Sequence, residues 1–120
     1  MADKSGREMI ADAKGRVREA TVGDVLAMQA RGTPAVYLDV REAEEWEGGH
    51  LPHAVLIPRG VLETHVEQSV PRDATVVVYC ARGNRSALAA DTLQQMGYRD
   101  VVSMAGGIGA WIQSGGAIEH

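Results

Sequence analysis

Apolar and polar residues follow a pattern that predicts strands and helices in alternation. Residues 35–40 and 75–79 are nearly continuous apolar runs, as is typical of strands buried on both faces. Shorter apolar runs predict strands at 54–57 and 100–104. Helices are predicted from helical spacing of apolar residues, or from polar segments that end at glycine, at 21–31, 41–47, 61–69, 86–96 and 108–113. This alternation predicts an α/β fold, with a mostly parallel sheet and helices on both faces.

Particular residues indicate where several of these helices begin and end. Thr21 and Asp24 have the spacing of a capping box, which marks a helix start. Gly32 and Gly97 are predicted to stop two helices, because glycine is favoured just after a helix C-terminus. Ser86 is predicted to be the N-cap of the helix that follows it.

The chain is predicted to fold as one domain. Its 120 residues can bury a core without disulfides. Residues 1–20 are polar with a few apolar positions at helical spacing, and we interpret them as an N-terminal extension that forms a docking helix or a loose tail. The domain then covers residues 21–114, and residues 115–120 form a short C-terminal tail.

Composition and charge restrict the partners. A net charge of −4 offers no general attraction to nucleic acid or to an anionic membrane, so neither is expected. No apolar run approaches the length of a membrane span, and the N-terminus is too charged for a signal peptide. A cytoplasmic location is therefore expected, and a single cysteine, which cannot form an internal disulfide, agrees with a reducing compartment.

That cysteine, Cys80, is the strongest candidate for chemistry. It directly follows the apolar strand 75–79 and precedes a polar loop and a helix. Loop N–H groups, the positive end of the helix and two arginines all favour thiolate over thiol, which indicates a nucleophile. The alternative is a buried cysteine that packs as a small hydrophobe. Asp39, Pro58 and Cys80 all lie at predicted carboxyl ends of strands, where α/β folds bind their ligands.

Four segments, taken in order, resemble the motifs of a known family. They are Leu38-Asp39-Val40-Arg41-Glu42, Glu45 to Pro52, Tyr79 to Ser86, and Gly106 to Trp111. From about Thr21 to Trp111 the chain resembles a single-domain rhodanese, a sulfurtransferase. The resemblance implies a rhodanese-like sheet of about five strands. It also implies that Cys80 takes a sulfane sulfur from a donor such as thiosulfate, becomes a persulfide, and passes the sulfur to cyanide or a thiol.

The resemblance also assigns roles to other residues. The substrate-binding loop is Ala81, Arg82, Gly83, Asn84, Arg85 and Ser86. Its N–H groups are expected to stabilise negative charge, and its two arginines to add positive charge unless they are solvated surface residues. Asp39 and Arg41 are expected to brace the site as structural supports. Independently of the resemblance, Arg59 lies just past Pro58 at another predicted strand end. From this position we predict that it faces the pocket and binds the sulfonate end of thiosulfate, with a surface arginine as the alternative.

Two residues depart from a family pattern. His53 stands where rhodaneses usually have glycine, so a positive φ there would cost some strain. Related cysteine phosphatases place an arginine six positions after the cysteine, where this chain has Ser86, and Arg85 comes one position early. This shorter loop favours sulfur transfer over phosphoryl chemistry.

We therefore predict a thiosulfate sulfurtransferase that needs no cofactor. The four histidines show no metal-ligand spacing with Cys80, so no metal site is expected. The expected partners are a small anionic sulfur donor and an acceptor that is a small thiol, cyanide or a protein thiol. Two alternatives stay open, namely a non-catalytic rhodanese-like binding module and a cysteine phosphatase or arsenate reductase.

Overall fold

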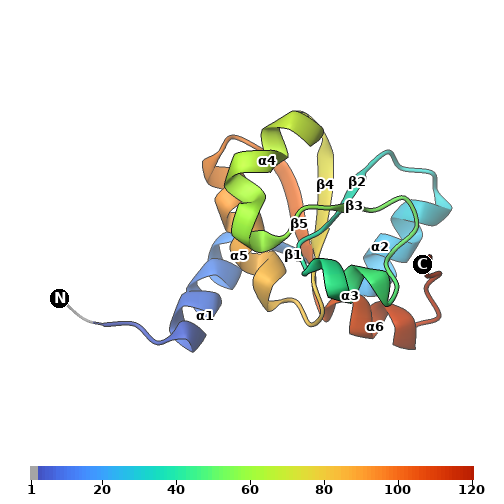
Figure 1. Ribbon diagram of the computed structural model, residues 1–120, viewed down its shortest axis with the longest axis horizontal. Coiled ribbons are helices and arrows are strands. Elements are labelled where there is room, and N and C mark those ends of the chain that lie inside the picture. The colour runs from blue at the N-terminus through green and yellow to red at the C-terminus, as the bar shows by residue number, and fades with distance from the viewer. Residues whose placement is uncertain (1–2) are drawn as a thin grey trace.

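A five-stranded sheet forms the centre of the molecule (Figure 1). The computed structural model describes residues 3–120. All neighbouring strands are parallel, in the order β1-β5-β4-β2-β3, which confirms the predicted α/β class. The strands are Arg18–Ala20 (β1), Val36–Asp39 (β2), Val55–Leu56 (β3), Thr75–Tyr79 (β4) and Asp100–Met104 (β5).

Helices cover both faces of this sheet. They are Gly6–Arg16 (α1), Val22–Ala30 (α2), Ala43–Glu47 (α3), Leu62–Ser69 (α4), Asn84–Gln95 (α5) and Gly107–Gln113 (α6), with a 3-10 turn at Arg59–Val61. Apolar residues of α2 and α6 share one core cluster, and those of α4 and α5 share another. The predicted two-sided covering of the sheet is therefore confirmed.

The central strand β4 contributes to both core clusters. Val76 and Val78 pack with α4 and α5, whereas Val77 and Tyr79 pack with α2 and α6. All four residues have no exposed surface. Successive side chains of a strand point to opposite faces, so a strand covered on both sides must be apolar throughout. This requirement explains why β4 was predicted with its observed bounds.

The N-terminal segment is more ordered than a loose tail. Helix α1 buries Ala13 completely, and Arg16 pairs with Asp91 of α5 through two hydrogen bonds of 3.1 and 2.8 Å. Strand β1 follows and joins the sheet beside β5. No hydrophobic run predicted β1, because it is a short edge strand with two exposed residues and a single buried alanine, Ala20. Residues 1 and 2 of the predicted extension lie outside the described residues.

Local backbone signals were mostly interpreted correctly. The Thr21–Asp24 capping box is present, and Gly32 and Gly97 have φ of +69° and +99° after their helices. His53 has φ +63°, the conformation that the glycine of related chains would adopt without strain. The prediction that Ser86 is an N-cap is wrong. Helix α5 begins two residues earlier, at Asn84, and a glycine with positive φ occupies its N-cap position.

Candidate active site

Cys80 is the first residue after β4, and the start of α6 fixes its backbone. The N–H of Ile108 donates to the carbonyl oxygen of Cys80 at 2.9 Å, and the N–H of Gly109 donates to that of Ala81 at 3.2 Å. Gly107 makes this approach possible, since a Cβ at that position would lie 2.4 Å from the carbonyl oxygen of Cys80. The glycines after β5 therefore let one loop pack against the other.

A hollow of about 300 Å³ opens at the cysteine. Its lining residues are Cys80, Ala81, Arg82, Asn84 and Arg85. Cys80 is only 1% exposed, so it forms part of the wall of this hollow with little sulfur surface in contact with bulk solvent. The loop after β4 thus brings five of its predicted residues to a single small concavity.

Loop N–H groups surround the sulfur atom. The N–H of Gly83 donates to Cys80 Sγ at 3.1 Å, and that of Ser86 donates at 3.4 Å. Burial by itself raises the pKa of the Cys80 thiol, but these hydrogen bonds outweigh burial and hold the pKa below its ordinary value. Burial is the largest single influence on this pKa; among the hydrogen bonds that lower it, those of the Ser86 hydroxyl and N–H act most strongly, followed by those of the N–H groups of Gly83 and Arg82.

A pair of buried hydroxyl groups extends this arrangement. Ser86 Oγ lies 3.4 Å from Cys80 Sγ and 2.8 Å from Ser103 Oγ, and both serines have no exposed surface. Ser86 therefore faces the sulfur from the first turn of α5. Ser103 was not among the predicted site residues. The available signal was a serine between Val102 and Met104, in a strand that is otherwise apolar after Asp100.

Asp39 and Arg41 form a buried brace beside the site. The guanidinium donates to both carboxylate oxygens of Asp39, with the shortest contact at 2.8 Å, and the two side chains are 0% and 7% exposed. Arg41 also donates to the carbonyl oxygens of Gly49 at 2.8 Å and Glu45 at 3.3 Å. This pair therefore ties the end of β2 to α3 and to the turn after it, a geometry suited to the supporting role predicted for both residues.

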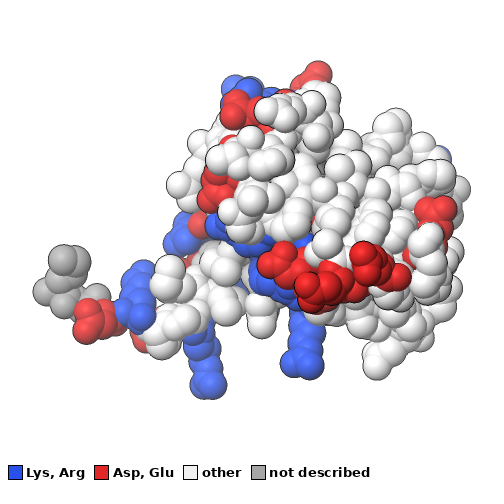
Figure 2. Space-filling view, viewed as in Figure 1, with Lys and Arg blue, Asp and Glu red and all other residues white. Residues whose placement is uncertain are grey.

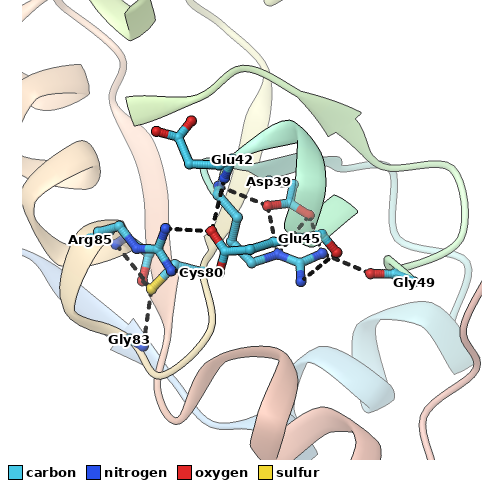
Figure 3. A network of polar contacts seen from close by, with 9 residues as sticks. Asp39, Glu42, Glu45, Gly49, Cys80, Gly83 and Arg85 are labelled. Atoms are coloured by element: carbon cyan, nitrogen blue, oxygen red, sulfur yellow. Dashed lines mark hydrogen bonds and ion pairs between the residues drawn. The ribbon is translucent and has the colours of Figure 1, made fainter. Parts of the chain in front are cut away.

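Arg85 also pairs with a carboxylate instead of pointing freely into the hollow. Its two terminal nitrogens donate to Glu45 at 2.7 and 2.9 Å (Figure 3). The hydrogen bond from Arg85 lowers the pKa of Glu45 to about 2, although burial opposes this shift. Glu45 was not predicted as a partner of Arg85, because an acidic residue on a predicted polar helix gives no sign of which distant cation it contacts.

The structure does not bring Arg59 to the cysteine. Arg59 donates to Glu63 at 3.1 Å and to Thr92 Oγ1 at 3.2 Å, and it lines a separate hollow between α1 and α5. The prediction that Arg59 faces the pocket of Cys80 is therefore corrected. Arg59 begins a 3-10 turn, and from this position its side chain reaches one helical turn ahead to Glu63 and across to α5.

Residues 3–120 contain neither a candidate metal site nor a candidate membrane-spanning helix. No group of three or more His, Cys, Asp or Glu side chains is arranged to hold a metal ion within this range. In the same part of the chain, no helix combines the length and hydropathy needed to cross a membrane.

The structure is an α/β domain with a cysteine loop at the carboxyl end of its central strand, and comparison with known proteins shows which family has these features. Residues 21–114 match the model of the rhodanese-like domain, so the chain belongs to the rhodanese-like family. A sulfurtransferase of Allochromatium vinosum is 36% identical over 78 residues, which cover 65% of this chain and 72% of that protein. The relatives of this chain thus include sulfurtransferases.

Other relatives are much longer or carry a different description. The probable adenylyltransferase/sulfurtransferase MoeZ of Mycobacterium tuberculosis is 37% identical over 67% of this chain, and the match spans only 21% of that protein. A solved structure from Rhodopseudomonas palustris has a TM-score of 0.89 and 34% identity, and the match covers 99% of this chain and 97% of the other. That protein is described as being of unknown function and as a possible tyrosine phosphatase.

Proposed function

We propose that this protein transfers a sulfane sulfur from thiosulfate, or from a similar anionic donor, through a persulfide on Cys80 to cyanide or a thiol acceptor. The main support is the position of Cys80 Sγ, which lies at a small hollow and accepts hydrogen bonds from the N–H groups of Gly83 and Ser86. These fixed donors stabilise a sulfur anion without having to reorganise during the reaction. Membership of the rhodanese-like family supports the same chemistry.

The proposed reaction has two displacement steps. In the first step, the thiolate of Cys80 attacks the outer sulfur of thiosulfate, the S–S bond of thiosulfate breaks, and sulfite leaves with the bonding electrons. In the second step, cyanide or an acceptor thiolate attacks the outer sulfur of the persulfide, and the Cys80 thiolate leaves. No outside oxidant is needed, because the sulfur donor supplies the oxidised sulfur atom.

The loop residues are assigned to donor binding. The backbone of Ala81 to Ser86 wraps the sulfur, and the side chains of Arg82 and Asn84 are exposed at the hollow. Arg82 forms no ion pair within residues 3–120, so its charge is available to an anionic donor. The charge of Arg85 is already balanced by Glu45. We therefore assign anion attraction chiefly to Arg82 and to the loop N–H groups.

Direct loading of the cysteine tests this function. After incubation with thiosulfate and desalting, intact-protein mass spectrometry should detect a gain of one sulfur atom, and addition of cyanide should remove it as thiocyanate. The Cys80→Ser variant should show neither step, whereas Ser69→Ala, an exposed serine on α4, should behave like the wild type. Full sulfur transfer by Cys80→Ser would refute the assignment.

A phosphatase is the second candidate, because the Rhodopseudomonas protein is described as a possible tyrosine phosphatase. The geometry at Arg85 argues against it. A phosphoryl group needs a guanidinium directed at its oxygens, whereas here both terminal nitrogens of Arg85 contact Glu45. Parallel assays with an aryl phosphate should show no hydrolysis that depends on Cys80. Hydrolysis lost in Cys80→Ser would favour the phosphatase.

A non-catalytic binding module is the third candidate, and the burial of Cys80 is the observation in its favour. The N–H groups of Gly83 and Ser86 that donate to Cys80 Sγ argue against it, because these hydrogen bonds lower the pKa of the thiol, whereas burial of an inert packing cysteine in an apolar site raises its pKa. Failure of both thiosulfate and small alkylating reagents to modify Cys80 in the folded protein would support the module.

A further inference from the structure

Helix α1 forms one wall of a second hollow beside the cysteine loop. The volume of this hollow is about 560 Å³, and its lining residues are Gly6, Arg7, Ile10, Ala11, Lys14 and Asn84. Residues 7, 10, 11 and 14 of α1 are spaced three or four apart, so they form one continuous stripe along the helix. Asn84 also lines the hollow at Cys80, so the two hollows meet at this residue.

The position of α1 is fixed by its contacts with the domain. A complete capping box at Ser5 and Glu8 closes its first turn, and the buried Ala13 and the bidentate Arg16–Asp91 pair hold it on α5. The match to the rhodanese-like model begins at residue 21, after α1. The hollow is therefore built from an element outside the matched domain and from the first residue of α5.

The charges along this stripe are not balanced by neighbouring side chains. Within residues 3–120, the side chains of Arg7 and Lys14 form no ion pair and donate no hydrogen bond, whereas Lys4 and Arg16 of the same segment are paired with Asp12 and Asp91. Arg7 and Lys14 are seven residues apart, which corresponds to about 10 Å along a helix. Apolar surface from Ile10 lies between them.

Basic and acidic side chains are unevenly distributed on the surface around this hollow. Figure 2 shows Lys and Arg side chains projecting from the lower edge of the molecule below α1 and below the loop after β4. A ridge of acidic side chains covers α3 on the other side of that loop. A small anion is attracted by the basic side chains near α1 and the loop after β4, and is repelled by the acidic side chains over α3.

We propose that the hollow along α1 binds the sulfur acceptor, and that this acceptor is a small thiol carrying two carboxylates. This inference rests on the proposed sulfur transfer at Cys80. Arg7 and Lys14 would each hold one carboxylate, Ile10 would contact the aliphatic part, and the thiol would pass Asn84 to reach the persulfide. The acceptor thiolate then attacks the outer persulfide sulfur, forming its own persulfide, and the Cys80 thiolate leaves.

Acceptor preference in the second half-reaction tests the proposal. Protein loaded with thiosulfate and freed of the donor is mixed with glutathione, with glutathione diethyl ester or with 2-mercaptoethanol, and loss of the persulfide is followed. Wild-type protein should favour glutathione over its ester. In the variant Arg7→Gln/Lys14→Gln, the preference for glutathione over 2-mercaptoethanol should fall about fivefold or more, as expected from the loss of two partly solvated ion pairs.

A matched control removes the same charge elsewhere. Arg31 and Arg99 are exposed and form no ion pair within residues 3–120, so Arg31→Gln/Arg99→Gln changes the net charge equally without touching the hollow. This variant should keep the wild-type preference. Equal loss of preference in both double variants would show that only the net charge matters, which would overturn the proposal. Absence of any preference in the wild type would overturn it as well.

A binding measurement separates this inference from the proposed function. If thiosulfate does not load Cys80, sulfur transfer fails, yet S-methylglutathione, which cannot accept sulfur, should still shift the amide NMR signals of Ala11, Lys14 and Asn84. The shifts should be weaker in the double variant at positions 7 and 14 and should decrease with added salt. Absent or scattered shifts would refute the acceptor site even where persulfide formation succeeds.

Discussion

Both terminal nitrogens of Arg85 donate to the carboxylate of Glu45, at 2.7 and 2.9 Å, and this pair joins the cysteine loop to α3. One of the two loop arginines predicted to attract substrate therefore has its charge balanced within the fold. Because the Asp39–Arg41 pair in turn holds α3 through the carbonyl oxygen of Glu45, two ion pairs connect the end of β2 to the start of α5.

The Glu45–Arg85 pair should make stability depend on pH in the acid range. The folded protein lowers the pKa of Glu45 from 4.5 to about 2, so the pair stabilises the fold above the higher value and loses this effect as pH falls toward the lower one. Glu45→Gln should therefore lower the free energy of unfolding at neutral pH by about 0.5–1 kcal/mol, since both side chains are about one-third exposed. Urea unfolding at a series of pH values should show this difference shrinking with acidification. A difference that is constant over the whole range would contradict the assignment.

The buried Asp39–Arg41 pair should contribute far more to the free energy of unfolding than the Glu45–Arg85 pair. Asp39→Asn or Arg41→Met leaves one buried charge without its partner, and we expect a loss of about 3–5 kcal/mol in each case. Because they are in contact, the double variant should lose less than the sum of the two. The control is Arg18→Met in the exposed Arg18–Asp100 pair, where a loss below about 1 kcal/mol is expected. Equal losses for the buried and the exposed pair would show that burial does not set the cost.

Removal of the Ser86 hydroxyl should reduce the thiolate content of Cys80. The hydroxyl of Ser86 contributes most among the hydrogen bonds that lower the pKa of Cys80, so Ser86→Ala should raise that pKa and lower the thiolate fraction at neutral pH about tenfold. Ser103→Ala should act in the same direction but less strongly, because Ser103 contacts Ser86 and has no hydrogen bond to the sulfur. Titration of the thiolate by ultraviolet absorbance measures both, with Ser69→Ala as the control. An unchanged titration curve in Ser86→Ala would show that the hydroxyl does not act on the sulfur.

Gly107→Ala should destabilise the protein and displace the cysteine loop. Its Cβ would lie 2.4 Å from the carbonyl oxygen of Cys80, and alanine resists the observed φ of +61°. We expect a loss of about 2 kcal/mol or more in unfolding free energy. Gly15→Ala in α1 meets no atom within 4 Å and should instead gain up to about 1 kcal/mol from helix propensity. The same sign for both substitutions would contradict the close approach of α6 to the loop.

Sequence patterns predicted the interior of the fold better than its edges. Strand β4 and the capping box at Thr21 rest on local rules, since a doubly covered strand must be apolar and a capping hydroxyl acts three residues away. Strand β1 was not predicted, because an edge strand that buries only Ala20 shows no alternation of apolar and polar residues from which a strand could be recognised. Ser86 was misplaced because its local preference for a cap was overridden by Gly83, whose positive φ begins the helix two residues earlier.

In the candidate site, too, features that depend on neighbouring residues were predicted, whereas contacts between distant residues were not. The position of Cys80 at a strand end, and the loop that follows it, were contained in the order of residues, because strand, loop and helix are adjacent in the chain. The partners of the cations were not. Arg85 meets Glu45 forty residues away, and Arg59 reaches Glu63 and Thr92 instead of the cysteine.

By itself, the sequence determined the class of fold, the nucleophile candidate and the elements that carry it, because these depend on periodicity and on neighbours in the chain. Only the tertiary structure decided which charges are neutralised, that Ser103 joins Ser86 behind the sulfur, and that α1 forms a basic hollow beside the cysteine loop. Such relationships depend on how distant segments pack, and side-chain pairing across elements leaves no periodic trace in the sequence.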